Sequence, residues 1–404
     1  MIELRRLIEQ EIRERGPIPF SRYMALCLYH PELGYYSLNA AQFGKAGDFY
    51  TSSDVHAVFG RLMARQFEEM WRLLDEPEQI EIRELGPGRG LFAQDVLDWS
   101  EKKFPEFFRA LQYVLIEQSG QLRGRIEQTL TRHIESGRAE LVSGKSGRPS
   151  AAEAEPSGVR SSATEVAPLQ NLRQSSALHA PVIVFTNEFF DALPVAVIST
   201  KGSLRIDVQD GRFIETWVPA SAEELEFLDR YSIHPEEGER IEVPLQSVAA
   251  MRAACGFDRG FVIVIDYGYT REEQLAGRHR GTVKAIRHHA VSASPYEAPG
   301  EQDITADVNF TALAAVAENA GFKAQKLLTQ SQFLMGIGEA NQFADAFEDC
   351  RLPQERAKVA LQLKHLVTPA GMGESFQVLV ASKEVEEKSV AKLAGLSFGR
   401  PVSS

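Results

Sequence analysis

The feature that most constrains the fold is a short apolar segment leading directly into three closely spaced glycines. Residues 80–85 are predicted as a β-strand and residues 91–99 as a helix, and the chain at their junction reads Glu84-Leu85-Gly86-Pro87-Gly88-Arg89-Gly90. Glycines spaced by two let the backbone turn sharply and approach a ligand closely, and the start of the next helix adds the positive end of a dipole. A strand, a glycine turn and a helix in this order predict a ligand site in an α/β protein.

Strands and helices keep alternating after this turn. Strands are predicted at 113–116, more weakly at 139–142, and at 182–186 and 261–266, with a helix at 121–135 between the first two. Such alternation is typical of a parallel sheet covered by helices on both faces. The sequence therefore predicts an α/β, Rossmann-like fold with a mostly parallel sheet.

The other segments are assigned to places around this sheet. Helices are predicted at 3–15, from near Ser21, at 54–74 and at 308–319, hairpin strands at 195–218, and final strands at 322–328 and 376–381. Asp303 and Asp307 are expected to cap the helix at 308–319, with substrate contact as the alternative. We expect an N-terminal helical segment (1–75), a first core part (76–200), an inserted smaller region (201–258), a second core part (259–385) and a flexible tail (386–404).

Residues 144–180 interrupt the alternation. They are rich in Ser, Ala, Pro and Gly and contain few large apolar residues. Such a segment buries too little surface to offset the entropy lost on ordering. We therefore expect a flexible insertion in place of a crossover helix.

Composition excludes several classes of protein. The chain has 44 basic and 56 acidic residues, a net charge of -12, which argues against a general nucleic-acid binder and is compatible with a basic peptide as substrate. Cys27, Cys255 and Cys350 lack the spacing of a zinc site or a disulfide framework, so no metal is expected. Without a long apolar run, and with an N-terminus rich in Glu, the sequence predicts a cytoplasmic protein that does not insert into membranes.

The identity of the bound nucleoside follows from the details of the glycine turn. Glu117 follows the strand at 113–116, where an acid accepts both hydroxyls of a ribose. A nicotinamide site favours G-x-G-x-x-G, but Leu91 stands where the last glycine belongs, and no Gly-Lys-Ser/Thr follows as in a P-loop. A G-x-G-x-G turn preceded by an acid, here Glu84, is the usual arrangement for S-adenosylmethionine. The alternative is a structural glycine turn that binds nothing.

Further segments fit one pattern together with the glycine turn, in order, from about residue 16 to 381. They are Gly47-Asp48-Phe49-Tyr50-Thr51-Ser52, Asn187-Glu188-Phe189-Phe190-Asp191-Ala192-Leu193-Pro194, Asp266-Tyr267-Gly268, Asp303-Ile304-Thr305-Ala306-Asp307-Val308 and Met372-Gly373-Glu374-Ser375-Phe376. Together they resemble the MidA-like family of S-adenosylmethionine-dependent methyltransferases, whose animal members are mitochondrial complex I assembly factors.

The resemblance implies a class I methyltransferase fold with S-adenosylmethionine as the methyl donor. It also implies a protein substrate, with an arginine of a respiratory NADH–quinone oxidoreductase subunit as the acceptor. The insertion at 144–180 departs from the family, but none of the matching segments lies inside it. The cofactor is expected to bind Glu84, Gly86, Pro87, Gly88, Gly90 and Glu117.

The acceptor side is predicted at the end of the strand at 182–186. Ligands of open α/β sheets bind at the carboxyl ends of the strands, and Asn187, Glu188 and Asp191 follow directly. Carboxylates hold a guanidinium through charge-assisted hydrogen bonds, so these three residues are the expected catalytic group. Acids capping a helix are the alternative for Glu188 and Asp191.

Aromatic residues are predicted to complete both halves of the site. Phe189 and Phe190 are expected to wall the acceptor channel, although at least one of them fits the core equally well. Asp266 and Tyr267, at the end of the most hydrophobic strand, are expected to contact the substrate, and the alternative is a strand-end acid that caps a neighbouring loop. An N-terminal loop is expected to close over the cofactor and exclude water, through Gly47, Asp48, Tyr50, Thr51 and Ser52.

Two other functions stay open at this point. A non-catalytic assembly factor could keep the fold and bind its partner without turnover, and a small-molecule methyltransferase would share the cofactor site. The intact Gly86, Gly88, Gly90 and Glu117 favour an active enzyme, because a scaffold has no need of a ribose-binding acid.

Overall fold

The computed structural model describes residues 2–38, 57–143, 180–287, 290–339, 341–369 and 371–398. The lid residues expected at Gly47, Asp48, Tyr50, Thr51 and Ser52 lie outside the described residues, as do residues 144–179 of the expected insertion.

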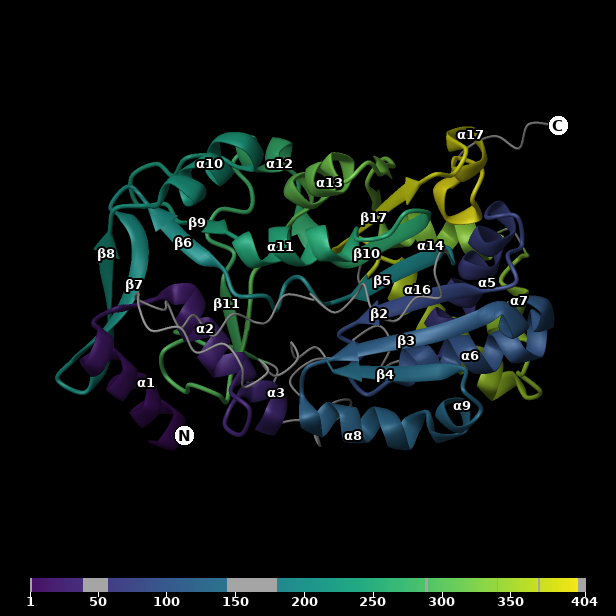
Figure 1. Ribbon diagram of the computed structural model, residues 1–404, viewed down its shortest axis with the longest axis horizontal. Helices are drawn as coiled ribbons and strands as arrows, with labels where there is room; N and C mark the ends of the chain where they lie inside the picture. The colour runs from purple at the N-terminus through teal and green to yellow at the C-terminus, as the bar shows by residue number, and fades with distance from the viewer. Residues whose placement is uncertain are drawn as a thin grey trace, which may run out of the picture.

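A mixed sheet forms the centre of the fold (Figure 1), with strand order β15-β17-β10-β5-β2-β3-β4. Five strands are mutually parallel: β4 (Ala139–Ser143), β3 (Leu111–Glu117), β2 (Ile80–Leu85), β5 (Val182–Asn187) and β10 (Gly260–Tyr269). In the register, Leu85 lies opposite Ile116 and Thr186. The carboxyl ends of these strands therefore meet at one edge of the sheet, as the alternation predicts.

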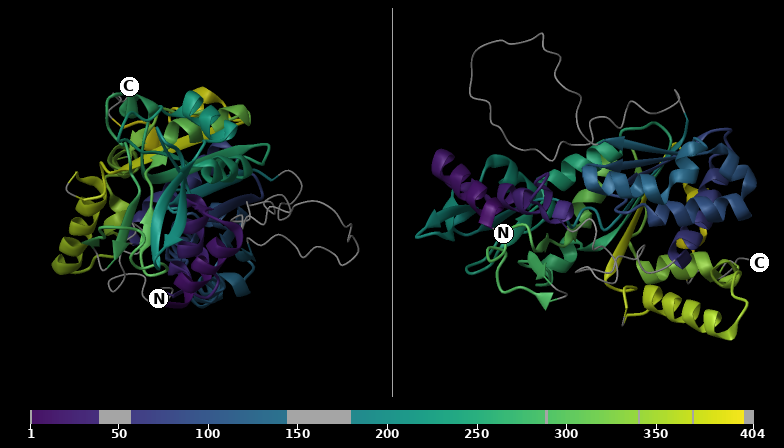
Figure 2. Two further views of the ribbon diagram at one scale, coloured as in Figure 1. Left: turned by 90° about the vertical axis from the view of Figure 1, so that its left-hand side faces the viewer. Right: turned by 90° about the horizontal axis from the view of Figure 1, so that it is seen from below.

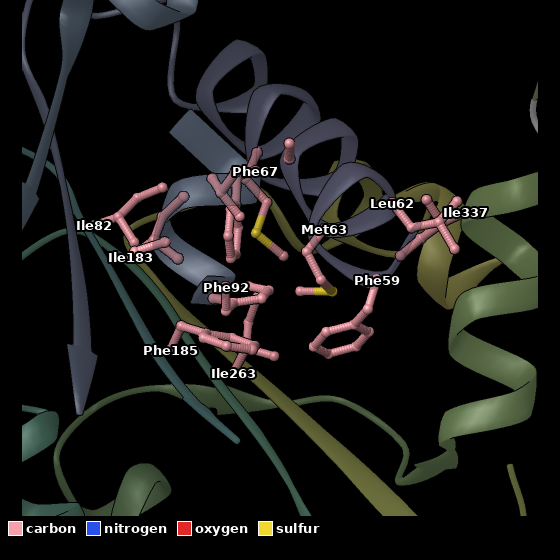
Figure 3. Close-up of a cluster of buried hydrophobic side chains, with 14 of the residues drawn as sticks. Phe59, Leu62, Met63, Phe67, Ile82, Phe92, Ile183, Phe185, Ile263 and Ile337 are labelled. Carbon is pink, nitrogen blue, oxygen red and sulfur yellow. The ribbon is translucent and has the colours of Figure 1, made fainter. Parts of the chain in front are cut away.

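Helices cover both faces of the sheet. One face packs on α5 (Ala57–Leu73) and α6 (Leu91–Lys103), and the other on α11 (Leu245–Ala254) and α13 (Phe310–Asn319). Figure 3 shows the first of these cores, in which the rings of Phe92 and Phe185 stack with centroids 4.5 Å apart. Apolar residues alternate between the two faces along each strand, so Phe185 faces α6 while Val184 faces α11 and α13.

Three short helices link the strands at the β4 edge. They are α7 (Pro105–Ala110), α8 (Gly120–Thr129) and α9 (Thr131–Glu135). The expected single helix at 121–135 is thus divided at Leu130, whose backbone leaves the helical conformation.

A second, antiparallel sheet lies beside the main one. It contains β1 (Ile18–Pro19), β6 (Ala196–Ser199), β7 (Gly202–Gln209), β8 (Arg212–Val218) and β9 (Ile241–Val243). Its faces carry α1 (Ile2–Arg15), α2 (Phe20–Tyr29) and α10 (Ala222–Tyr231). Because β1 pairs with β7, the N-terminal helices and the inserted region share one core, a contact that the sequence did not predict.

A third, small sheet and several short elements complete the fold. A three-stranded sheet joins β11 (Lys284–Arg287), β12 (Ala290–Val291) and β13 (Asp303–Thr305), and α3 (Tyr35–Leu38) lies beside α8 (Figure 1). The short helix α12 (Arg271–Leu275) follows β10. Strand β14 (Val308–Asn309) pairs with the last two residues of β10. Helix α13 is capped by Asn309, whose side chain accepts a hydrogen bond from the backbone N–H of Ala312, so the caps predicted at Asp303 and Asp307 are wrong.

The C-terminal third differs most from the sequence prediction. In place of one strand at 322–328 there are two short ones, β15 (Lys323–Ala324) and β16 (Leu328–Thr329), both paired with β17 (Phe376–Lys383). Between them and β17 stand three helices that were not predicted, α14 (Gln330–Glu339), α15 (Ala344–Phe347) and α16 (Pro353–Val367).

Residues 386–398 are not a loose tail. They form α17 (Glu387–Val390) and a 3₁₀ turn (Ala394–Leu396), and the side chains of Val390 and Leu393 are buried. The backbone N–H groups of Ala394 and Gly395 donate to side chains of α5, at Glu69 and Gln66. This turn lies at the opposite end of the molecule from α1 (Figures 1 and 2). Among the described helices, none has the length and apolarity needed to cross a membrane.

Candidate cofactor and acceptor site

The glycine turn between β2 and α6 requires glycine for two different reasons. Gly86 and Gly88 have φ values of 67° and 55°, in the left-handed region that L side chains disfavour. At Gly86 a Cβ atom would also lie 2.9 Å from Cδ2 of Phe189, whereas at Gly88 no described atom lies within 4 Å of that position. Gly86 is thus needed for close packing against Phe189, and Gly88 leaves open space beside the turn.

Glu84 is held inside the sheet just before the turn. Its Oε2 accepts a hydrogen bond of 2.9 Å from the hydroxyl of Tyr113, and only 5% of the residue is exposed. Burial raises the pKa of the Glu84 carboxyl to about 8. The contact with the cofactor expected of Glu84 stays a prediction, since the structure gives this carboxyl a partner within the sheet.

Glu117 ends β3 at the same edge of the sheet as the glycine turn. Its Oε1 accepts a hydrogen bond of 2.8 Å from the backbone N–H of Ser119, which caps α8. Burial raises the pKa of this carboxyl to about 7. Only the ionised form has both oxygens available as acceptors, so a ribose would bind best above that pH.

We expect the affinity for S-adenosylmethionine to fall as the pH is lowered from 8 to 6. Protonation of Glu117 removes an acceptor, so the affinity falls by at most about tenfold per pH unit below the pKa. Glu117→Gln should flatten this profile and weaken binding at pH 8. Glu242 is a buried acid whose pKa is also raised to about 7, and Glu242→Gln is the matched control. Calorimetry at several pH values measures the effect, and a flat wild-type profile would contradict it.

The loop after β5 carries backbone strain at a polar residue. Glu188 has a φ of 53°, which is rare for a residue other than Gly, Asn or Asp. The side-chain amide of Asn187 donates to Oε1 of Glu188 at 3.0 Å, and no residue that the structure describes donates to the buried Oδ1 of Asn187. Strained residues and unsatisfied buried acceptors gather at functional sites, so both observations mark this loop.

Asp266 fixes that loop from the end of β10. Its Oδ2 accepts hydrogen bonds from the backbone N–H groups of Phe189, Phe190 and Asp191, and its Oδ1 accepts from that of Tyr267. The side chain is fully buried. Asp266 therefore holds the loop at 187–191, the predicted acceptor loop, in place, and the substrate contact expected of Asp266 stays a prediction.

Asp266→Asn should lower the free energy of unfolding by about 1–3 kcal/mol, because an amide offers one acceptor oxygen where four N–H groups now bind. Urea denaturation measures the loss. Asp258, exposed in the turn before β10, gives the control Asp258→Asn, which should leave the midpoint within error. Equal midpoints for the Asp266→Asn protein and the wild type would rule out the anchoring role.

Four further predicted site residues differ in how deeply they are buried. Asp191 is 8% exposed, and burial, together with the charge of Asp307, raises the pKa of its carboxyl to about 7. Tyr267 is half-buried, with its ring against Phe376. Phe190 is buried in the core on the α11–α13 face, the alternative that the sequence left open for one of the two rings, whereas Phe189 is half-buried against Gly86.

Sequence reasoning missed the contribution of the N-terminal helices. The hydroxyl of Tyr29, at the end of α2, donates to the backbone carbonyl of Ala192 at 2.9 Å. The hydroxyl of Tyr36, in α3, donates to Oδ1 of Asp303 at 3.3 Å. The aromatic residues of this segment were the available signal, but they gave no indication of which strands they would reach.

Comparison with known proteins identifies the chain. Residues 62–328 match the model of a family described as "Putative S-adenosyl-L-methionine-dependent methyltransferase". The chain belongs to this MidA-like methyltransferase family. The predicted fold and cofactor are thereby confirmed, and the enzyme is a methyltransferase that depends on S-adenosylmethionine.

Relatives of known name or structure cover most of the chain. Protein arginine methyltransferase NDUFAF7 homolog, mitochondrial, of Drosophila melanogaster is 27% identical over 93% of this chain and 84% of its own length. The human protein arginine methyltransferase NDUFAF7, mitochondrial, is 27% identical over 91% of this chain and 80% of its own. A crystal structure from Burkholderia thailandensis, bound to S-adenosyl-homocysteine, covers 98% of this chain and 95% of its own with a TM-score of 0.77 and 27% identity.

The residues of this methyltransferase fit S-adenosylmethionine. No atom of the described part of the chain fills the space beside Gly88, and Glu117 stands at the end of the neighbouring strand. Phe189, in the loop at 187–191, contacts the glycine turn. The residues predicted to bind the methyl donor and those predicted to bind the methyl acceptor are therefore neighbours.

Proposed function

We propose that this enzyme methylates an arginine side chain of a protein partner, with Glu188, Asn187 and Asp191 at the acceptor. The observation that carries the proposal is the strained, polar loop at 187–191, which touches the glycine turn through Phe189. The names of the relatives, protein arginine methyltransferases, support the same acceptor.

Methylation of a guanidinium requires residues that hold the cation and a residue that removes a proton from it. The cofactor, when bound, supplies a methyl group on a sulfonium ion. A guanidinium nitrogen has to be aligned with that methyl at about 3–3.5 Å and has to lose a proton. Glu188 is proposed to pair with the cation, and Asn187 to accept a further N–H at its Oδ1. Asp191, with its pKa raised to about 7, is suited to take the proton near neutral pH.

The partner is proposed to be a respiratory NADH–quinone oxidoreductase subunit, in keeping with the resemblance to assembly factors. A cytoplasmic location stays a prediction, because the named relatives are mitochondrial.

The test uses cofactor carrying a deuterated methyl group. Purified protein is incubated with that cofactor and with the solubilised oxidoreductase, and labelled peptides are located by mass spectrometry. Labelled methylarginine is the expected result. Label on another side chain or on a small molecule would overturn the arginine assignment, and cofactor binding without any transfer would favour a scaffold.

A further inference from the structure

The N-terminal helices place two tyrosines at the junction of the cofactor and acceptor residues. The rings of Tyr29 and Tyr36 lie 5.4 Å apart at 31° to each other, and both side chains are half-buried. The Tyr29 hydroxyl is bonded to the acceptor loop at Ala192, and α3 lies beside α8, the helix that follows Glu117. The two rings therefore form one aromatic surface in contact with the acceptor loop.

Acidic groups lie near this surface, and one of them, Asp303, accepts a hydrogen bond from the Tyr36 hydroxyl. Burial raises the pKa of both phenols; the charges of Asp191, Asp303 and Glu117 act in the same direction on Tyr29, and those of Asp303 and Asp191 on Tyr36. These acids come from β3, from the acceptor loop and from β13, so the fold collects them from distant parts of the chain.

One basic group that acts on these acids is engaged elsewhere. Lys284 acts on the carboxyl of Asp191, but its ammonium donates to Oδ1 of Asp307 at 3.2 Å and is half exposed. An aromatic surface beside carboxylates suits a flat cation, because its face stacks on the rings while its N–H edge binds the acids. A compact ammonium group has no flat face to stack on the rings, so it fits this surface less closely than a guanidinium does.

We propose that Tyr29, Tyr36 and Asp303 bind the guanidinium group of the acceptor and select it against other side chains. The ring faces and the Asp303 carboxylate touch the cation, and the Tyr36 hydroxyl positions that carboxylate through its hydrogen bond. The inference rests on the proposed function and assigns recognition to the N-terminal helices, which lie outside the glycine turn and the loop at 187–191.

The test compares three short peptides on protein saturated with S-adenosylhomocysteine. The peptide is acetyl-Gly-Gly-Arg-Gly-Gly-amide, and its variants carry citrulline, a neutral isostere, or lysine, a cation of another shape. Dissociation constants are measured by NMR titration up to millimolar peptide. The wild type should prefer arginine to both variants by about tenfold or more, as loss of one charge-assisted hydrogen bond predicts.

Variants of the tyrosine cluster should remove this preference while leaving S-adenosylhomocysteine binding unchanged. Asp303→Asn should bring the arginine-to-citrulline ratio close to one, and Tyr36→Phe, which keeps the ring, should lower it by a few-fold. Tyr296, in the loop between β12 and β13, donates to Glu215 of β8 at 2.8 Å, so Tyr296→Phe loses a similar bond at another place and should leave the ratio at the wild-type value.

Two results would overturn the inference. One is an unchanged arginine-to-citrulline ratio in both the Asp303→Asn and Tyr36→Phe proteins, and the other is a wild type without arginine preference. The labelling experiment separates this failure from that of the proposed function. If the labelling experiment finds methylarginine on the oxidoreductase, the proposed function holds even when the inference about the tyrosines fails. If it finds no methylarginine, the proposed function and the inference fail together.

Discussion

Gly88→Val is expected to weaken binding of S-adenosylmethionine by about a hundredfold or more, the largest effect that we predict for a single substitution. Gly88 has a φ of 55° and open space where a side chain would project. A valine there fills the space beside the turn that we assign to the cofactor. A hundredfold loss corresponds to about 2.8 kcal/mol of binding free energy.

The same substitution should cost the fold much less. A left-handed conformation costs an L residue about 1–2 kcal/mol, and no described atom lies close enough to Gly88 to clash with a Cβ. Calorimetry with the cofactor and urea denaturation measure the two effects separately.

Gly137 supplies a matched control for Gly88. It has a φ of 73° and likewise no described atom within 4 Å of a Cβ, but it lies between α9 and β4, away from the carboxyl edge of the sheet. Gly137→Val should lose similar stability and keep full cofactor affinity. Equal cofactor affinities for the two variants would contradict the assignment of the glycine turn.

Glu188→Gln is expected to reduce methyl transfer by about ten- to a hundredfold with little change in cofactor affinity. The change keeps the size of the side chain but removes the charge that pairs with the cation, a loss of about 1.5–3 kcal/mol for one charge-assisted hydrogen bond. The measurement pairs methyl incorporation with the cofactor dissociation constant. Unchanged turnover would move the acceptor away from this loop.

Glu188→Gly should separate function from stability at the same position. With a φ of 53°, this residue is strained as Glu and relaxed as Gly, so the variant should melt at a higher temperature than the wild type while losing turnover. Glu384 also has a positive φ, of 54°, and is exposed after β17. Glu384→Gly should raise the melting temperature similarly without changing turnover. A destabilised Glu188→Gly protein would show that the side chain holds the loop together.

The sequence was most informative where a structural signal is local. Strand β2 and the start of α6 were predicted to the residue, because an apolar run, a glycine turn and a helix follow one another within a dozen positions. The loop at Asn187 was located for the same reason, from the apolar strand before it.

Features that depend on distant partners were not predictable. The bonds from Asp266 to the backbone of Phe189, and from Tyr29 to that of Ala192, join residues that come together only when the sheet has formed. The strain at Glu188 is likewise imposed by its surroundings, since nothing in the residue type indicates a positive φ. Helix α16 was missed because it is mostly exposed and offers no clear apolar stripe.

The pairing of β10 with β17 has a consequence for the synthesis of the chain. Strand β10 is buried along most of its length, and its antiparallel neighbour on one side lies more than a hundred residues later, at Phe376–Lys383. While a ribosome makes the intervening residues, that edge of the sheet has no strand to pair with, and contacts of such long sequence separation form slowly. An exposed, apolar strand edge attracts other chains. We therefore expect nascent chains to need chaperone protection until residue 383 has left the ribosome.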